Sequence, residues 1–288
     1  MIIKRLIAAV CAVLVFMFAA TLPAAAQGIS KLRVQSAFPS SSLIYESSKY
    51  WAERVKAMTG GKLVIDLLPA GSVVPPFEVL DAVHKGVIDG AHSSAAYWVG
   101  KNRASTLFGP APGGPFGMDM LDYYGWLYEG GGLQLYRDFY QKELKRKVFV
   151  VPMGSAANQV LGWFKKPVKN WEDLKGRKCR ETGIGAEVFS KSGMSTVNVP
   201  GGEIIPSGER GVIECAEFVG PAEDMKIGFQ AIWKYLYMPS IHENATVLEL
   251  LFNTDVWNKL SPEQREIIQS AAWEATMRSQ IVSNKLNA

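Results

Sequence analysis

The chain has 288 residues, is 48% hydrophobic and carries a formal net charge of +4. A chain of this length can bury a large core, in one big domain or in two smaller ones. The small net charge gives no support to nucleic-acid binding, and three cysteines are too few for a disulfide framework.

The N-terminus is typical of a secretory signal peptide over residues 1–26. Lys4 and Arg5 form a basic region, residues 7–22 form an apolar stretch, and Ala24-Ala25-Ala26 is a small-residue cleavage site. A retained anchor is the alternative interpretation, but the apolar stretch is marginal against the about 20 residues that a membrane span needs. Removing 26 residues from 288 leaves 262, and losing Lys4 and Arg5 lowers the net charge from +4 to +2. We therefore expect a mature protein that is free in an extracytoplasmic compartment.

Extended and helical patterns then alternate along the chain. In order, they predict a strand over 31–37, a helix over 43–58, a strand over 62–68, a short helix from Pro75-Pro76 through Val83, and a strand over 87–93. Such alternation predicts a parallel sheet covered by helices, with ligands bound at the carboxyl ends of the strands.

A second alternation follows a loop over 105–118 that is rich in glycine and proline, and a helical segment that begins at Leu121. Its predicted elements are a strand over 147–153, a strand around Cys179-Arg180, a helix over 186–192, a short helix over 202–210 and a strand over 212–219. Two alternating blocks predict two α/β lobes. A capping box at Ser261, with Pro262 and Gln264, predicts a long C-terminal helix.

Four polar residues are candidates for a small-molecule site. Arg180 precedes a glycine-containing turn into a helix, where a guanidinium can clamp a carboxylate with two parallel hydrogen bonds. Glu217 ends a predicted strand, and Glu243 follows a turn at Pro239. Together with the amide of Gln159, these carboxylates offer oxygen ligands for a hard cation such as Na⁺ or Ca²⁺, and backbone carbonyls can complete the shell. The alternative is that these groups make unrelated surface contacts.

Aromatic residues near these positions predict an apolar wall for a ligand; they are Trp163, Phe164, Phe218 and the pair Tyr97-Trp98. The alternative is that they are ordinary core residues. The histidines have no spacing typical of a zinc site, and the sequence contains no recognisable catalytic motif.

The two cysteines that follow the signal peptide, Cys179 and Cys215, form either one bridge or two buried thiols. If Arg180 and Glu217 both point into one cleft, strand alternation places the two thiols on opposite faces. We therefore expect them to be unbridged.

The chain resembles the solute-binding subunits of tripartite ATP-independent periplasmic (TRAP) transporters, the DctP-like family, and in particular its 2-oxo acid and monocarboxylate branch. The matching landmarks, in order, are Tyr97-Trp98-Val99-Gly100-Lys101, Gly114-Pro115-Phe116-Gly117, Tyr128-Glu129-Gly130-Gly131-Gly132, Gln159 before Gly162-Trp163-Phe164, Arg180, Gly201-Gly202-Glu203-Ile204, Glu217-Phe218-Val219-Gly220-Pro221, and His242-Glu243. The ordered set, which covers nearly the whole mature chain, is more specific than any one landmark.

The resemblance implies a role for each matching residue. It implies that Arg180 pairs with the ligand carboxylate, and that Gln159, Glu217 and Glu243 bind a cation that bridges to the ligand. The main-chain carbonyl of Phe218 completes this expected metal set. The branch usually has tryptophan where this chain has Phe218.

The expected ligand-contacting set is Arg180, Gln159, Ser155, Phe218, Trp98 and Tyr97. Within it, the branch usually has an amide near the position of Ser155, where this chain has a hydroxyl.

The fold that the resemblance implies is α/β: a two-lobed periplasmic binding protein fold with a ligand cleft between the lobes. Residues 27–150 and about 239–288 are expected to form lobe I, and residues 151–238 lobe II. The family generally continues past the position of Ala288 with further helical sequence, and a homodimer that exchanges this segment is one assembly it implies.

The expected function is capture of a small carboxylate, a 2-oxo or 2-hydroxy monocarboxylic acid, in the periplasm and its delivery to a TRAP membrane permease, without catalysis. The alternative in the same class is a dicarboxylate or sugar-acid receptor, which a second cationic group in the pocket would distinguish. A remote alternative is a secreted metal-dependent enzyme acting on 2-oxo acids. A ligand-sensing subunit of a signalling system would have the same site.

Overall fold

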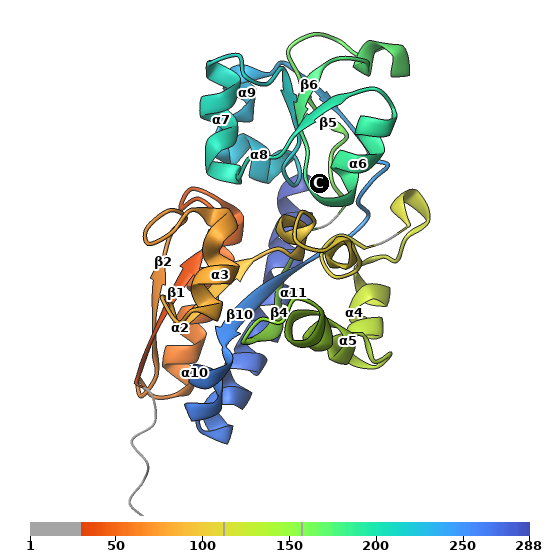
Figure 1. The fold of residues 1–288 in the computed structure, drawn as a ribbon. Helices are drawn as coiled ribbons and strands as arrows, with labels where there is room; N and C mark the ends of the chain where they lie inside the picture. The colour runs from red at the N-terminus through yellow and green to blue at the C-terminus, as the bar shows by residue number, and fades with distance from the viewer. Residues whose placement is uncertain (1–29, 112, 157) are drawn as a thin grey trace, which may run out of the picture.

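The computed structural model describes residues 30–111, 113–156 and 158–288, which form two lobes stacked one above the other (Figure 1). The predicted signal peptide, residues 1–26, lies outside the described residues. Within the described part of the chain, no helix combines the length and apolar character needed to span a membrane.

The first lobe contains the N-terminal alternation and the C-terminal helices. Its elements are β1 (Lys31–Ser36), α2 (Leu43–Met58), β2 (Val64–Leu68), η1 (Pro76–Glu78), α3 (Val79–His84), β3 (Gly90–Ser93), η2 (Ala95–Trp98), η3 (Arg103–Leu107), η4 (Gly114–Phe116), α4 (Met120–Tyr128), α5 (Gly132–Asp138), η5 (Phe139–Glu143), β4 (Val148–Ala156), β10 (Thr246–Asn253), α10 (Thr254–Lys259) and α11 (Pro262–Asn287). The strand order in its sheet is β2-β1-β3-β10-β4.

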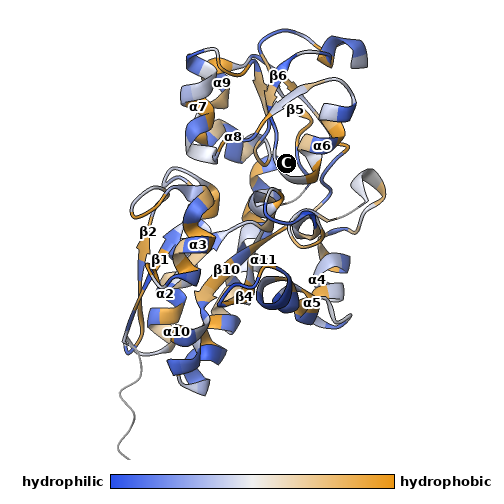
Figure 2. Cartoon of the chain, viewed as in Figure 1, coloured by the Kyte–Doolittle hydropathy of each residue, from blue (hydrophilic) through white to orange (hydrophobic). Residues whose placement is uncertain are grey.

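This sheet is mixed: the strands of the N-terminal alternation are parallel, and the pairs that involve β10 are antiparallel. Strand β1 pairs in parallel with β2 and β3, as expected, but β10 runs antiparallel to both β3 and β4. All eight residues of β10 are buried, and the strand is strongly hydrophobic (Figure 2). An all-parallel sheet was therefore the wrong expectation, because the central strand β10 was not predicted.

Two apolar cores fill the space on either side of the first sheet. One packs α2 and α11 against the strands through Trp51, Val55, Ile268 and Ala272. The other packs α3, α4 and α5 against the opposite face. Helix α2 begins where the Ser42 side chain accepts a hydrogen bond from the backbone N–H of Tyr45, which satisfies one of the otherwise free N–H groups of the first turn.

The second lobe is an insertion between β4 and β10. It contains β5 (Gly162–Phe164), η6 (Trp171–Leu174), β6 (Lys178–Arg180), α6 (Gly183–Lys191), β7 (Ser195–Val197), α7 (Gly201–Glu209), β8 (Cys215–Ala216), α8 (Pro221–Ile227), α9 (Phe229–Ile232) and β9 (Tyr235–Tyr237). Its sheet has the order β7-β6-β8-β5-β9, with β6 parallel to β7 and β8. The strand predicted over 212–219 is only two residues long, so Glu217 lies beyond its end. The exact lobe boundaries, 27–150 with about 239–288 and 151–238, stay a prediction.

The predicted C-terminal helix is confirmed as α11. The Ser261 side chain accepts from the backbone N–H of Gln264, and the Gln264 side chain accepts from the backbone N–H of Ser261, so the capping box is complete. The helix runs along β4 in the first lobe and ends beside α8 in the second, where the side-chain Oδ1 of Asn287 accepts from the backbone N–H of Ala222 (Figure 1). Helix α11 therefore contacts both lobes.

Cys179 and Cys215 form a disulfide, so the expectation of two separate thiols is wrong. The two residues are register neighbours on the parallel strands β6 and β8, with their Cα atoms 4.5 Å apart. The expected placement on opposite faces requires strand alternation as far as Glu217, but β8 ends at Ala216. Because the neighbours Arg180 and Ala216 are also in register, the two cysteines share one face of the sheet.

The disulfide should stabilise the second lobe. We expect the double substitution Cys179→Ala and Cys215→Ala to lower the free energy of unfolding by about 4 kcal/mol, because the bridge closes a loop of 36 residues. Urea unfolding of the wild type and of the double variant, each with and without a reductant, measures this difference. The reductant should lower the free energy of unfolding of the wild type and leave that of the double variant unchanged. A wild type that is indifferent to reduction and still has two free thiols by mass spectrometry would contradict the bridge.

Candidate functional site

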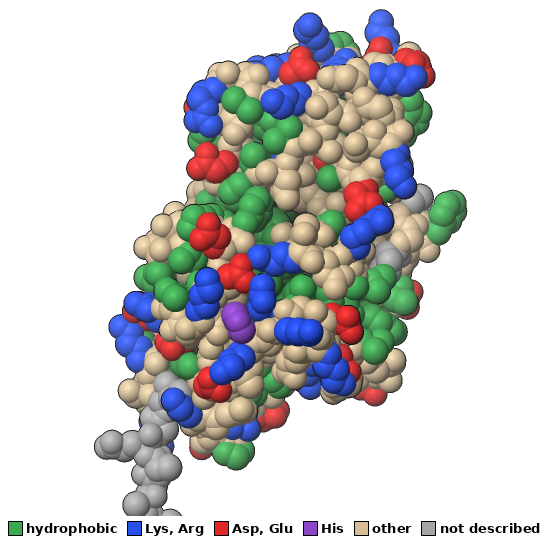
Figure 3. Space-filling view, in the orientation of Figure 1, with side chains coloured by type: hydrophobic (Ala, Val, Ile, Leu, Met, Phe, Trp, Pro, Cys, Tyr) green, Lys and Arg blue, Asp and Glu red, His purple; other side chains and the backbone are tan. Residues whose placement is uncertain are grey.

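A small cavity lies where the two lobes meet, and its lining comes from both lobes. It has a volume of about 30 Å³ and is lined by Phe38, Ile44, Ser94, Ala96, Tyr97, Ala156, Gln159, Arg180, Thr182, Phe218, Val219, Glu243, Thr246 and Leu248. The space-filling view shows apolar side chains in the depression between the upper and lower lobes (Figure 3). The sequence candidates Arg180, Gln159, Glu243, Phe218 and Tyr97 therefore line one cavity.

Arg180 is fixed by the second lobe at the carboxyl end of β6. The residue is 1% exposed, and its Nη1 donates to the main-chain carbonyl of Glu217 at 2.7 Å and to Glu217 Oε1 at 2.5 Å. Its Nε donates to the carbonyl of Val199 at 3.2 Å, and the guanidinium lies 5.5 Å from the centre of the Phe218 ring. A buried guanidinium held in this way is oriented before any ligand arrives.

The amide of Gln159 and the carboxylate of Glu243 form a second group on the cavity wall. Gln159 Nε2 donates to Glu243 Oε2 at 2.6 Å, and Thr246 Oγ1 donates to the same oxygen at 2.9 Å. Gln159 Oε1 is buried and accepts no hydrogen bond from any residue that the structure describes. An orphaned buried acceptor beside a carboxylate fits a hard cation, for which amide and carboxylate oxygens are suitable ligands.

Three buried carboxylates surround the one guanidinium. Glu181, Glu217 and Glu243 are each less than 5% exposed. Burial, followed by the neighbouring charge of Glu217, raises the pKa of Glu243 to about 8. Burial also raises the pKa of Glu217 against the opposing effect of Arg180, and it raises the pKa of Glu181 well above its ordinary value. Protons or a cation must therefore compensate the excess negative charge.

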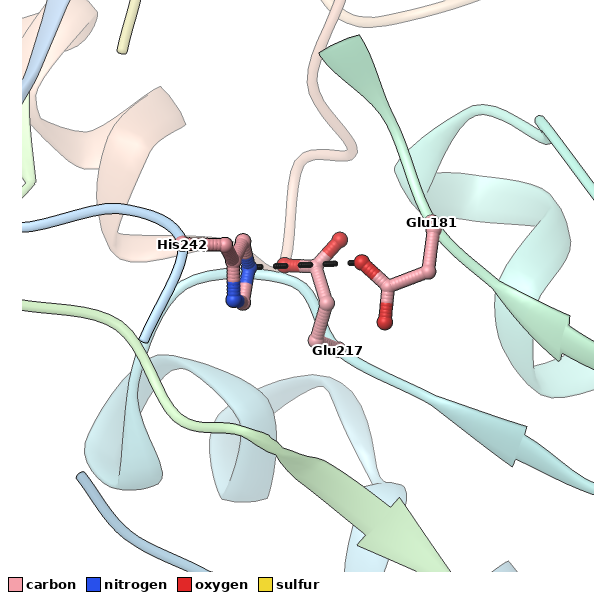
Figure 4. Close-up of side chains that lie close together, drawn as sticks. All are labelled: Glu181, Glu217 and His242. Atoms are coloured by element: carbon pink, nitrogen blue, oxygen red, sulfur yellow. Dashed lines mark ion pairs between the residues drawn. The ribbon is translucent and has the colours of Figure 1, made fainter. Parts of the chain in front are cut away.

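Glu181 and His242 belong to this cluster although the sequence did not single them out as site residues. Figure 4 shows Glu181, Glu217 and His242 converging from separate segments, with His242 Nε2 4.0 Å from Glu181 Oε2. In the sequence, the one indirect signal for Glu181 is its place directly after Arg180. Because β6 ends at Arg180, Glu181 lies outside the strand, and its side chain does not have to point to the opposite face of the sheet. The histidine spacing could not indicate this cluster, because Glu181, Glu217 and His242 come from segments that are far apart in the sequence.

Two residues predicted to contact the ligand lie elsewhere. Trp98 is fully buried in the first lobe, where its indole N–H donates to Tyr140 and Glu249, and it does not line the cavity. Ser155 faces helix α11, where its hydroxyl donates to Gln280. A buried tryptophan needs an acceptor for its N–H, and Glu249 supplies it.

Two further aromatic candidates are core residues. Trp163 donates its indole N–H to Asp224 at 2.9 Å, and Phe164 packs against Cys179 and Cys215 in the apolar core of the second lobe. The alternative interpretation of these aromatics as core is therefore correct for Trp98, Trp163 and Phe164, whereas Tyr97 and Phe218 line the cavity.

Comparison with known proteins confirms the resemblance. The model of the family described as bacterial extracellular solute-binding protein, family 7, matches residues 34–288. A monocarboxylate 2-oxoacid-binding periplasmic protein of Nostoc sp. is 38% identical over 245 residues, which cover 85% of this chain and 66% of the relative. The match to a second curated relative, from Comamonas testosteroni, covers 65% of that relative's length. The chain thus spans about two thirds of the length of these relatives.

Two solved structures of TRAP solute-binding proteins, each 31% identical, share the fold. One, from Bordetella bronchiseptica, is a dimer described with copurified calcium and picolinate; its TM-score is 0.84, and the match covers 90% of this chain and 76% of that chain. The other, from Pseudoalteromonas atlantica, has bound sodium and pyruvate; its TM-score is 0.82, and the match covers 89% of this chain and 76% of that chain.

The buried carboxylates predict a pH dependence of stability. Glu243 titrates near 4.5 when exposed but near 8 in the fold, so the stability that its protonated form provides is fully present below pH 4.5 and is lost as the pH rises through 8. Burial lowers the pKa of His92 and of His242 to about 4. The stability that their neutral forms provide is therefore fully present above pH 6.5 and is lost as the pH falls through 4. Between pH 6.5 and 8, the cation-free protein should therefore lose stability, by up to about 1.4 kcal/mol per pH unit for each such carboxylate.

Urea unfolding in a chelator and a sodium-free buffer at several pH values measures this slope. Glu243→Gln should make the slope shallower, whereas Glu203→Gln, on an exposed position of α7, should leave it unchanged. Stability that is constant or rises from pH 6.5 to 8 would contradict the expected titration.

Proposed function

Because the chain belongs to the bacterial extracellular solute-binding protein family 7, we propose that it is the solute-binding subunit of a TRAP transporter and captures a small 2-oxo or 2-hydroxy monocarboxylic acid together with Na⁺ or Ca²⁺. The observation that carries this proposal is the cavity between the lobes. It brings one oriented guanidinium, that of Arg180, into the lining of the same cavity as the orphaned oxygen of Gln159 and the carboxylate of Glu243. A 2-oxo or 2-hydroxy acid needs both kinds of anchor: a guanidinium for its carboxylate, and oxygen ligands for a cation that contacts its 2-oxygen.

Each residue has a distinct role in the proposal. Arg180 pairs with the acid's carboxylate through the N–H groups of Nη2, because its Nε and Nη1 already donate to Val199 and Glu217. Gln159, Glu217 and Glu243, with the main-chain carbonyl of Phe218, hold the cation. The bound cation neutralises excess carboxylate charge and supplies a positive centre for the acid's oxygens. The rings of Phe218 and Tyr97 limit the length of the ligand's carbon chain.

The composition of the cavity favours a short monocarboxylate over the alternatives. Among the described residues that line it, Arg180 is the single lysine or arginine, whereas a dicarboxylate or sugar acid calls for a second cationic or strongly polar anchor. The relative from Nostoc sp. is described as binding 2-oxoacids, and the two solved relatives have bound picolinate or pyruvate. We propose a receptor without catalytic activity, because the family and these relatives are binding proteins.

The proposal also covers the cellular context. We place the mature protein in the periplasm, after cleavage of residues 1–26, where it would deliver its ligand to the membrane permease. The relative from Bordetella bronchiseptica is described as a dimer, and a homodimer is our proposal for this chain as well.

Direct contacts join the two lobes. Glu223 of α8 accepts from the backbone N–H of Leu43 at the start of α2 at 2.7 Å, and Lys226 pairs with Glu46 of α2. We propose that the lobes close by a hinge motion around the acid, and that these contacts add to the closed state.

The ligand prediction is a cation-dependent thermal shift. The protein should unfold at a higher temperature with short 2-oxo or 2-hydroxy acids in Na⁺ or Ca²⁺, and not after chelation in a sodium-free buffer. At a hundred times Kd, the ligand should add about 2.7 kcal/mol of stability. Arg180→Ala should weaken binding by at least about 100-fold, because charge-assisted hydrogen bonds are lost.

Arg54→Ala is the matched control, since Arg54 pairs with Glu274 on the surface of the first lobe. Wild-type affinity in a folded Arg180→Ala variant would refute the role of Arg180. A shift with dicarboxylates or sugar acids alone would favour the alternative receptor.

The closure prediction concerns Glu223. Glu223→Ala leaves the Leu43 N–H without its acceptor in the closed form, which should destabilise that form by about 1–3 kcal/mol. We expect a larger radius of gyration by small-angle X-ray scattering without ligand, and acid affinity lower by about 5- to 100-fold. Glu203→Ala, on the exposed face of α7, is the control. An unchanged radius and affinity would show that this contact does not bias closure.

A further inference from the structure

We propose that Glu181, Glu217 and His242 form a second metal site, for a divalent transition-metal ion, next to the proposed acid site. The three side chains offer ligand atoms that all lie within 4.8 Å of one another (Figure 4). They come from the end of β6, the end of β8 and the segment before β10. This site shares Glu217 with the proposed Na⁺ or Ca²⁺ site but does not use Gln159 or Glu243.

Two atoms in this cluster are buried and lack partners. Glu181 Oε2 and His242 Nε2 make no hydrogen bond to any residue in the described ranges, although their side chains are only 3% and 1% exposed. They face each other at 4.0 Å, too far for a hydrogen bond. Leaving two polar atoms unpaired in a dry site costs free energy, and one ion between them would satisfy both.

The separation suits two ligands of one ion. Zinc bonds to nitrogen and oxygen of about 2.0–2.2 Å place two ligands about 3.4 Å apart in a tetrahedron and at most about 4.3 Å apart. The three ligand atoms of the cluster would therefore have to approach by roughly 0.5 to 1.5 Å, which side-chain rotation can provide. Three protein ligands would leave a fourth position open.

The imidazole of His242 is prepared as a ligand. Its Nδ1 lies 2.6 Å from the Ser240 hydroxyl, the arrangement in which a ligating histidine uses its second nitrogen to bond an oxygen. The ring of Phe189 packs edge-on against it at 5.1 Å. A Cβ at Gly185 would lie 2.9 Å from the imidazole Cδ2, so only glycine leaves room for the ring there.

The donor set indicates which ion fits. One imidazole nitrogen with two carboxylates suits Zn²⁺, Mn²⁺ or Fe²⁺, whereas Na⁺ and Ca²⁺ prefer oxygen ligands throughout. Gln159 and Glu243 provide such an oxygen set on the neighbouring wall of the cavity. The two sites therefore differ in the class of ion that they select.

The test is zinc binding by the purified protein, without a histidine tag and without any organic acid. Isothermal titration should give one site, and Glu181→Gln and His242→Gln should each weaken it by at least about 100-fold, since even an outer-shell partner contributes 10- to 100-fold. His84→Gln controls for zinc binding by an unrelated histidine, one whose Nδ1 accepts from the backbone of Lys147. It should leave the affinity unchanged.

Gln159→Ala separates this proposal from the function proposed above. It should remove cation-dependent acid binding, because the proposed Na⁺ or Ca²⁺ site loses an oxygen ligand, and it should keep zinc binding, because Gln159 is not a ligand of the second site. Zinc affinity that survives in both Glu181→Gln and His242→Gln, or no zinc binding by the wild type, would overturn the second site and leave the acid site standing.

X-ray absorption by the zinc-loaded wild type provides a measurement that needs no variant to fold. We expect one imidazole nitrogen and two or more oxygens around the metal. A shell of oxygens alone would overturn the assignment of His242.

Discussion

Burial of three glutamate side chains around one guanidinium is the constraint on which the centre of this protein depends. Glu181, Glu217 and Glu243 are nearly inaccessible to water, and Arg180 compensates one negative charge. The remaining charge is tolerable only with bound protons or a bound cation. In the proposed function, ligand capture, ion binding and stability are therefore linked through one electrostatic balance.

The fold explains how residues far apart in sequence reach this centre. Arg180 and Ala216 are register neighbours on parallel strands, so the residues that follow each strand leave the sheet at the same edge. The segment that carries His242 and Glu243 returns from the second lobe toward β10 and passes in front of that edge. The cavity thus lies where the carboxyl ends of strands in one lobe face the crossing segments of the other, a usual place for ligands in α/β proteins.

Local sequence was sufficient where local physics decides the structure. The amphipathic pattern of α2, the capping box at Ser261 and the position of Arg180 at a strand end all follow from near neighbours. Sequence reasoning failed where the outcome depends on distant partners. Strand β10 is buried on both faces and has no alternation to reveal it; Trp98 became a core residue because Glu249 offers an acceptor. The disulfide and the place of Glu181 depended on where β6 and β8 end, and strand ends are the least certain part of such a prediction.

The position of β10 sets an order on how the molecule can assemble. This strand lies between β3 and β4, and among the described strands it is the one that joins β4 to the rest of its sheet. The first lobe cannot complete its sheet until about 250 residues of chain are available, while the second lobe, a continuous insertion, has all its strands earlier. Such long-range closure is slow. A nascent chain would therefore hold a first lobe whose sheet is unfinished until most of the chain has been made.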